Sequence, residues 1–97
     1  MIVKAHATED KRLLLAICDT KLIGKKFEEG NKQLDLTSEF YNGQEKSEQE
    51  TINLMKKAYI LNLVGENVVN LALKLELISG DHVDHISKIP YAQCLMG

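Results

Sequence analysis

Residues 13–18 read LLLAIC, and this stretch decides the fold that we expect. Six consecutive apolar residues have the length of a β-strand, and their lack of alternation indicates a central strand with both faces covered. Residues 2–8 alternate, which places Ile2, Lys4 and His6 on one face of a second strand. Because only a short polar break separates the two segments, they are predicted to pair as an antiparallel hairpin.

A third strand is expected downstream. Residues 32–41 alternate again, with Leu34 and Leu36 on one face, and the dipeptide at residues 42–43 is Asn-Gly, which favours a turn. The stretch before it, residues 20–30, is mixed in character, and its glycines indicate bends.

The second half of the chain changes to helical patterns. Ser47 and Glu50 have the spacing of a capping box, so a helix is expected to begin there and run to about residue 62. Gly65 marks a break, and residues 66–77 have the spacing of a second helix. Two final strands, residues 83–89 and 91–96, are expected on either side of Pro90.

The order of these elements predicts an α+β fold. Strands come first, two helices follow, and strands return, which is typical of helices that lie on one face of a mainly antiparallel sheet. We therefore predict one domain over residues 1–97, with a largely antiparallel sheet of about four to five strands. The helical pair, about 47–62 and 66–77, is expected to pack on one face of that sheet.

The composition is that of an ordinary globular chain, with 44% hydrophobic and 27% charged residues. No apolar run approaches the roughly 18 residues of a membrane span, and the first residues lack the apolar core of a secretory signal. We therefore expect a cytoplasmic protein that does not contact membranes. Cys18 and Cys94 are interpreted as buried thiols, with a redox pair as the alternative.

Charge is unevenly distributed along the chain. Residues 1–26 hold six basic and three acidic side chains, a balance of +3, whereas the remainder holds six basic and eleven acidic ones, a balance of −5. This asymmetry predicts a modest basic face that could contact an anion or RNA. The candidate binding residues on that face are Lys4, Arg12, Lys21, Lys25 and Lys26.

No pattern in the sequence indicates a catalytic or cofactor site. Residues 81–85 read DHVDH, which contains potential metal ligands, but neither helical nor extended spacing brings enough of them together. Cys18 lies in an apolar stretch, where burial raises the pKa of a thiol and opposes nucleophilic chemistry. We expect no catalytic residue, no metal and no cofactor.

Four segments of the chain resemble a small archaeal family that is defined only as a domain of unknown function. The segments are residues 16–30, 40–41, 62–73 and 89–93. The resemblance implies a cytoplasmic archaeal protein with no assigned activity and a role beside translation or RNA. The positions that match the family pattern, and are candidate binding residues on that ground, are Asp19, Gly24, Gly65, Glu66 and Gln93. The family's last motif often reads Pro-His-Ala-Gln, and Tyr91 stands here in place of the histidine.

Three hypotheses about function follow. The first is a non-enzymatic binding module that contacts RNA or a ribonucleoprotein in translation-related processes, from the basic first third and the family resemblance. The alternative is a protein–protein adaptor or subunit that uses its helical pair, whose apolar stripe includes Leu54, Leu61 and Val64. The second alternative is a small enzyme with a site near Cys18 and Asp19 or at residues 81–85.

Overall fold

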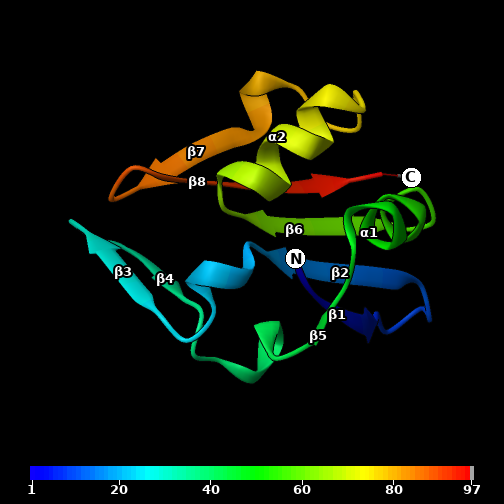
Figure 1. Ribbon diagram of the computed structural model, residues 1–97, viewed down its shortest axis with the longest axis horizontal. Helices are drawn as coiled ribbons and strands as arrows, with labels where there is room; N and C mark the ends of the chain where they lie inside the picture. The colour runs from blue at the N-terminus through cyan, green and yellow to red at the C-terminus, as the bar shows by residue number, and fades with distance from the viewer. Residues whose placement is uncertain (97) are drawn as a thin grey trace.

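The computed structural model describes residues 1–96, and its centre is a six-stranded mixed sheet (Figure 1). The strand order across the sheet is β5-β1-β2-β6-β8-β7. The bounds of these strands are β1 (Ile2–Ala7), β2 (Leu13–Cys18), β5 (Gln44–Glu45), β6 (Ile60–Val64), β7 (Val83–Ile86) and β8 (Ile89–Leu95).

The predicted first hairpin and central strand are confirmed. β1 and β2 pair antiparallel, with Ile2 opposite Cys18 and Ala7 opposite Leu13. On its other side β2 pairs in parallel with β6, with Leu14 beside Ile60 and Cys18 beside Val64. Because β2 has neighbours at both edges and covered faces, an unbroken apolar run suits it.

Two α-helices pack on one face of this sheet, as expected. They are α1 (Glu48–Met55) and α2 (Glu66–Lys74), and both lie in front of the sheet in Figure 1. The core between them and the sheet includes Met55 of α1 and Val68 of α2, together with Leu15, Ile17 and Leu61 from the strands. The predicted capping box at Ser47 and Glu50 is present at the start of α1.

The opposite face of the sheet is covered at one end by a small hairpin. Its strands are β3 (Lys26–Glu29) and β4 (Lys32–Asp35), which pair antiparallel as a separate two-stranded sheet. Three short 3-10 helices complete the fold, η1 (Thr20–Leu22), η2 (Glu39–Tyr41) and η3 (Gly80–His82). A second apolar cluster forms under the hairpin, with Leu34 and Leu36 packed near Cys18 and Val64.

The predicted extent of the first helix was wrong. The helix was expected to run to about residue 62, but it ends at Met55, and residues 60–64 form the central strand β6. The helical spacing of apolar residues continues past Ala58, but Ile60–Val64 is also an apolar run that can be covered on both faces. The second helix is shorter than predicted and ends at Lys74.

The sheet also has more strands than expected and mixed directions. The parallel pairing of β2 with β6 was not predicted, because it joins segments that are far apart in sequence. The predicted third strand, residues 32–41, divides into β4 and η2. Pro90 lies inside β8 rather than between two strands, opposite His85 of β7.

Burial removes part of the evidence for an adaptor surface on the helical pair. Leu61 and Val64, which were expected to contribute to an apolar stripe, are at most 1% exposed and belong to β6. Leu54 is partly buried against the main core. Within residues 1–96, no helix is long and apolar enough to cross a membrane.

Candidate functional site

A polar groove of about 550 Å³ lies where the parallel strands β2 and β6 end. Crevices at the carboxyl ends of parallel strands are frequent ligand sites, because the loops and helix starts that follow the strands diverge there. The walls come from the segment after β2, from the start of α1 and from one side of α2 along its length. The lining residues are Met1, Asp19, Thr20, Lys21, Glu48, Asn67, Asn70, Leu71 and Lys74.

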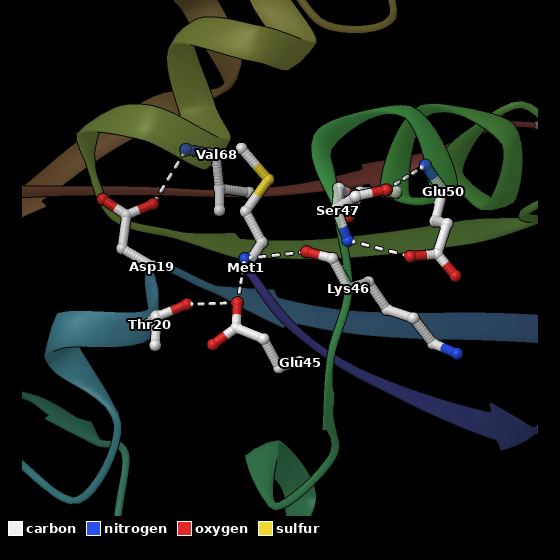
Figure 2. A network of polar contacts seen from close by, with 9 residues as sticks. Met1, Asp19, Thr20, Glu45, Lys46, Ser47, Glu50 and Val68 are labelled. Carbon is white, nitrogen blue, oxygen red and sulfur yellow. Dashed lines mark hydrogen bonds and ion pairs between the residues drawn. The ribbon is translucent and has the colours of Figure 1, made fainter.

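Asp19 is built into the wall of this groove as a helix cap. Its side chain points from the end of β2 to the first turn of α2 (Figure 2). One carboxylate oxygen accepts the backbone N–H of Asn67 at 3.0 Å, and the other accepts that of Val68 at 2.9 Å. Asp19 is only 2% exposed, and each of its oxygens accepts a hydrogen bond from α2 instead of from water. A negative charge at this position also stabilises the positive end of the helix dipole.

Gly65 makes the close approach of Asp19 to α2 possible. Its φ of 111° and ψ of 153° lie in a region of backbone conformation that is essentially restricted to glycine. A Cβ atom at this position would lie 2.4 Å from Cγ of Asp19, which is far inside van der Waals contact. Gly65 therefore acts with Asp19 in positioning α2.

A second polar network closes the groove on the side of α1 (Figure 2). The Glu45 carboxylate accepts from the Met1 ammonium at 2.7 Å and from the Thr20 hydroxyl at 2.8 Å, and these two hydrogen bonds lower its pKa. Ser47 and Glu50 cap α1, with Ser47 Oγ accepting from the Glu50 N–H at 3.1 Å. At each helix start, side chains of the protein itself therefore accept two backbone N–H groups. These are the N–H groups of Ser47 and Glu50 at α1 and of Asn67 and Val68 at α2.

Five polar or charged side chains remain free in the groove. Across residues 1–96, the ammonium groups of Lys21 and Lys74 and the carboxylate of Glu48 form no ion pair, and the side-chain amides of Asn67 and Asn70 form no hydrogen bond. Residues 67, 70 and 74 share one face of α2, because three- and four-residue spacings align along a helix. The groove therefore offers two cations, two amides and one carboxylate to a ligand.

The candidate basic residues do not gather on one surface. Arg12 lies before β2 and Lys21 after it, so a six-residue strand of about 20 Å separates them. Arg12 stacks on the Tyr59 ring, 4.2 Å from its centroid, and pairs with Asp10 at 3.0 Å. Lys4 lies on β1, in a different hollow of the surface.

The segment that carries Gly24, Lys25 and Lys26 connects η1 to the hairpin. Gly24 has a φ of 83° and donates its N–H to Leu36 O at 2.8 Å. Lys25 O accepts the Leu36 N–H at 2.8 Å, and Lys26 pairs with Glu28 at 3.7 Å. These residues do not line the groove, whereas Lys21 and Asp19 do.

The two remaining candidates also lie outside the groove. Glu66 is exposed and faces a separate hollow beside His85 and Lys88. Gln93 is exposed on β8, opposite Asn62 in the register of β6. The structure thus brings Asp19, Lys21 and the neighbouring Gly65 together and leaves the other candidates dispersed.

Cys18 is poorly suited to nucleophilic chemistry. Its side chain is fully buried. Burial, together with the negative charge of Asp19, raises its pKa to about 11. At neutral pH the thiol is protonated and inaccessible to a substrate, since the thiolate is the reactive form.

Cys94 lies close to His82, but the ring nitrogen next to the sulfur carries a proton and so is not available as a base. Its Sγ is 3.7 Å from Nε2 of His82, while Nδ1 of that ring accepts the Ser79 N–H at 3.0 Å. Because a backbone N–H only donates, the neutral ring carries its proton on Nε2 and points it at the sulfur. A general base would need that nitrogen free.

In the acidic and histidine-rich stretch at residues 81–85, Asp84 forms surface contacts with other parts of the protein. Asp84 accepts from Lys32 at 3.1 Å and from the Tyr91 hydroxyl at 3.3 Å. The His85 N–H, followed by Lys32, lowers the pKa of this carboxyl. Among the described residues, no three His, Cys, Asp or Glu side chains cluster in a way that could hold a metal ion.

Sequence patterns indicated only part of the groove. Asp19 and Lys21 were singled out as candidate binding residues, but Thr20, Glu48, Asn67, Asn70 and Lys74 were not. The spacing of residues 67, 70 and 74 along one helical face was a usable signal. What the sequence could not supply was the partner wall, since Lys21 and Lys74 are 53 positions apart (74 − 21).

Comparison with known proteins identifies the family. No curated protein matches the chain. One solved structure, the crystal structure of an uncharacterized conserved protein from Methanopyrus kandleri, is similar with a TM-score of 0.80 and 19% sequence identity. The match covers 98% of this chain and 90% of that one, and at this identity it establishes the fold alone. The sequence profile described as "Protein of unknown function (DUF424)" matches residues 6–96, so the chain belongs to the DUF424 family.

Proposed function

We propose that the protein is a non-catalytic binding module that contacts single-stranded RNA, free or within a ribonucleoprotein, through the groove between α1 and α2. The observation that carries this proposal is the set of free side chains there, two lysines, two asparagines and one glutamate, in a groove that Leu71 also lines. Lysine ammonium groups contact phosphates, and asparagine amides can both donate to and accept from base edges and ribose hydroxyls. A groove with these groups is suited to a short stretch of nucleotides.

The functional groups divide into two roles. Lys21 and Lys74 lie on opposite walls, one after β2 and one at the end of α2, so a backbone passing between them meets a cation on each side. Asn67 and Asn70 lie on the α2 wall, and Glu48 supplies an acceptor from α1. An acidic group in the groove disfavours a ligand that presents only phosphates and favours one with hydroxyl or amino donors, such as RNA.

The alternative of an enzyme has less support. Cys18 is buried with a raised pKa, and both oxygens of Asp19 are engaged by α2. A binding role needs none of these groups to react. The expected cytoplasmic location and the association with translation belong to this proposal and rest on the family resemblance.

The test is a titration of the isotope-labelled protein with short single-stranded RNA of mixed sequence, followed by amide chemical shifts. We expect shifts at Thr20, Lys21 and residues 67–74, and an affinity that falls as salt rises from about 50 to about 200 mM. Lys21→Ala and Lys74→Ala should each reduce the salt slope by about 0.7, the value for one phosphate contact with a single strand.

Two further variants separate the roles of the side chains. Asn70→Ala should weaken binding without changing the salt slope, because the amide is uncharged. Lys57→Ala is the matched control, since Lys57 is an exposed lysine after α1 and does not line the groove. Absence of shifts at the groove, or an equal effect of Lys57→Ala and Lys74→Ala, would rule out this proposal.

A further inference from the structure

One edge of the main sheet is open along residues 4–7 of β1, which have no neighbouring strand on that side. β5 pairs with β1 only at Ile2 and Val3, so β1 continues beyond its partner (Figure 1). The other edge strand, β7, has β3 and β4 packed near it, and the backbone O of Glu28 accepts from the Ser87 hydroxyl just after it. Beside β1, η2 lies near His6, whose Nε2 is 2.9 Å from Phe40 O, but Ala5 and Ala7 remain exposed. Exposed sheet edges are templates for a further strand, and proteins usually cover or blunt them.

The hydrogen bonds of β1 identify which backbone groups are free. Thr8 N–H donates to Arg12 O at 2.9 Å, so the backbone N–H and C=O groups of the even-numbered residues of β1 point toward β2. Lys46 N–H donates to Met1 O at 2.8 Å, so the odd-numbered residues face outward. Within residues 1–96, the outward N–H and C=O groups of Ala5 and Ala7 have no hydrogen-bond partner.

The surface beside this free edge is hollowed and basic. Two adjoining hollows, of about 450 and 330 Å³, share Ala5 and run along β1. Their charged lining residues are Lys4 and Lys46 at one end and Lys11 and Arg12 at the other, with no Asp or Glu among them. Of these four, only Arg12 has an acidic partner within residues 1–96, namely Asp10.

We propose that the free edge of β1, residues 4–8, binds an acidic extended polypeptide segment that adds to the sheet as a further strand. Ala5 and Ala7 provide the backbone hydrogen bonds, and the lysines at the two ends attract acidic side chains. Leu54 of α1, which lines the first hollow, offers an apolar contact for side chains on the helix face of the added strand.

Two other occupants fit less well. A second copy of this chain pairing edge to edge would place these basic side chains against each other, which opposes association. An RNA strand could use the positive charge, but it would leave the alternating N–H and C=O groups of β1 without complementary partners. The surface is also separate from the groove between α1 and α2, with which it shares no lining residue.

The test uses a short labelled peptide of alternating glutamate and valine, with a lysine and valine peptide as control. Binding of the acidic peptide should slow amide hydrogen exchange at Ala5 and Ala7, which exchange freely in its absence. Ala5→Pro removes the outward N–H without breaking a bond to β2, and we expect it to weaken binding by about tenfold or more. Ala5→Val keeps the N–H and should bind as the native protein does.

Charge variants test the partner's chemistry. Lys4→Glu and Lys46→Glu should each lower the affinity for the acidic peptide severalfold and reduce the salt dependence of its binding. Lys74→Ala, in the groove between α1 and α2, should leave this affinity unchanged. The proposal is wrong if the basic peptide binds as well as the acidic one, or if RNA rather than peptide protects Ala5 and Ala7. It also fails if the free protein dimerises through β1. The exchange measurement on the native protein decides the matter even if Ala5→Pro does not fold.

Discussion

At the residue scale, Asp19 and Gly65 jointly determine how α2 begins. Asp19 accepts two backbone N–H groups of the helix, and Gly65 leaves the space through which its carboxylate approaches. Both residues were expected to be binding residues on the ground of the family resemblance, and the structure gives them a positioning role at the groove wall.

Replacing Gly65 by alanine should destabilise the protein by about 3 kcal/mol or more, because the new Cβ meets Asp19 and the backbone conformation is strained. Gly24→Ala is the matched control. Gly24 also has a positive φ, 83°, but no atom lies within 4 Å of its added Cβ, so the cost should be about 1 kcal/mol. Chemical denaturation measures both free energies of unfolding, and equal losses would contradict the contact with Asp19.

Asp19→Asn should lower the free energy of unfolding by about 1.5–3 kcal/mol. The amide NH2 group replaces one of the two carboxylate oxygens, so a donor then faces the backbone N–H of either Asn67 or Val68. Asp81→Asn, at an exposed position, should change it by less than about 0.5 kcal/mol. If Asp19→Asn were equally silent, the carboxylate would not be the cap that its contacts indicate.

At the scale of elements, α1 depends on its capping box. Glu50 accepts the Ser47 N–H at 3.1 Å, and this backbone hydrogen bond is the main reason that its pKa is lowered. A carboxyl whose folded-state pKa is lowered stabilises the fold above its unfolded pKa. That contribution is lost as the pH falls through the folded value.

Glu50→Gln should therefore remove part of the acid sensitivity of α1. In the native protein, we expect amide protection in residues 48–55 to fall below about pH 4, the range in which glutamate ordinarily titrates. In the variant, amide protection should depend less on pH over that range, since the glutamine has no charge to lose. Ser47→Ala should cost about 1 kcal/mol at neutral pH, as other losses of a helix cap do. An unchanged pH profile in Glu50→Gln would exclude this role.

At the scale of the whole molecule, Cys18 reports on global unfolding. Its thiol is buried between the sheet and the β3–β4 hairpin, and its pKa is raised to about 11, first by burial. In the unfolded chain, the same thiol ionises near its ordinary pKa of about 8.5. Because the unfolded state loses this proton first, stability should fall as the pH rises above that value.

Labelling with a thiol reagent checks this expectation. Cys18 should react only as fast as the protein opens, and faster at alkaline pH as stability falls. Cys18→Ala should show a smaller decrease in unfolding free energy over the same alkaline range. Rapid labelling of Cys18 in the native protein at neutral pH would mean that the hairpin opens independently of the sheet.

Local features of this protein could be predicted from its sequence. Alternation in residues 2–7, the apolar run at 13–18 and the capping box at Ser47 each depend on neighbours along the chain, and all three were predicted. Local pattern failed at residues 60–64, because apolar residues in that stretch fit both a helix and a buried strand. What decided between them was the place of β6 beside β2.

The groove and the open edge of β1, in contrast, depend on contacts between segments that are far apart in the sequence. Asp19 contacts α2 across 48 positions of sequence, and Lys21 meets Lys74 in one groove because β2 and β6 run in parallel. Likewise, β1 has a free edge because β5 stops after two residues. These features arise from pairing between distant segments, whose energy depends on the complete fold and leaves no periodic signal in the sequence.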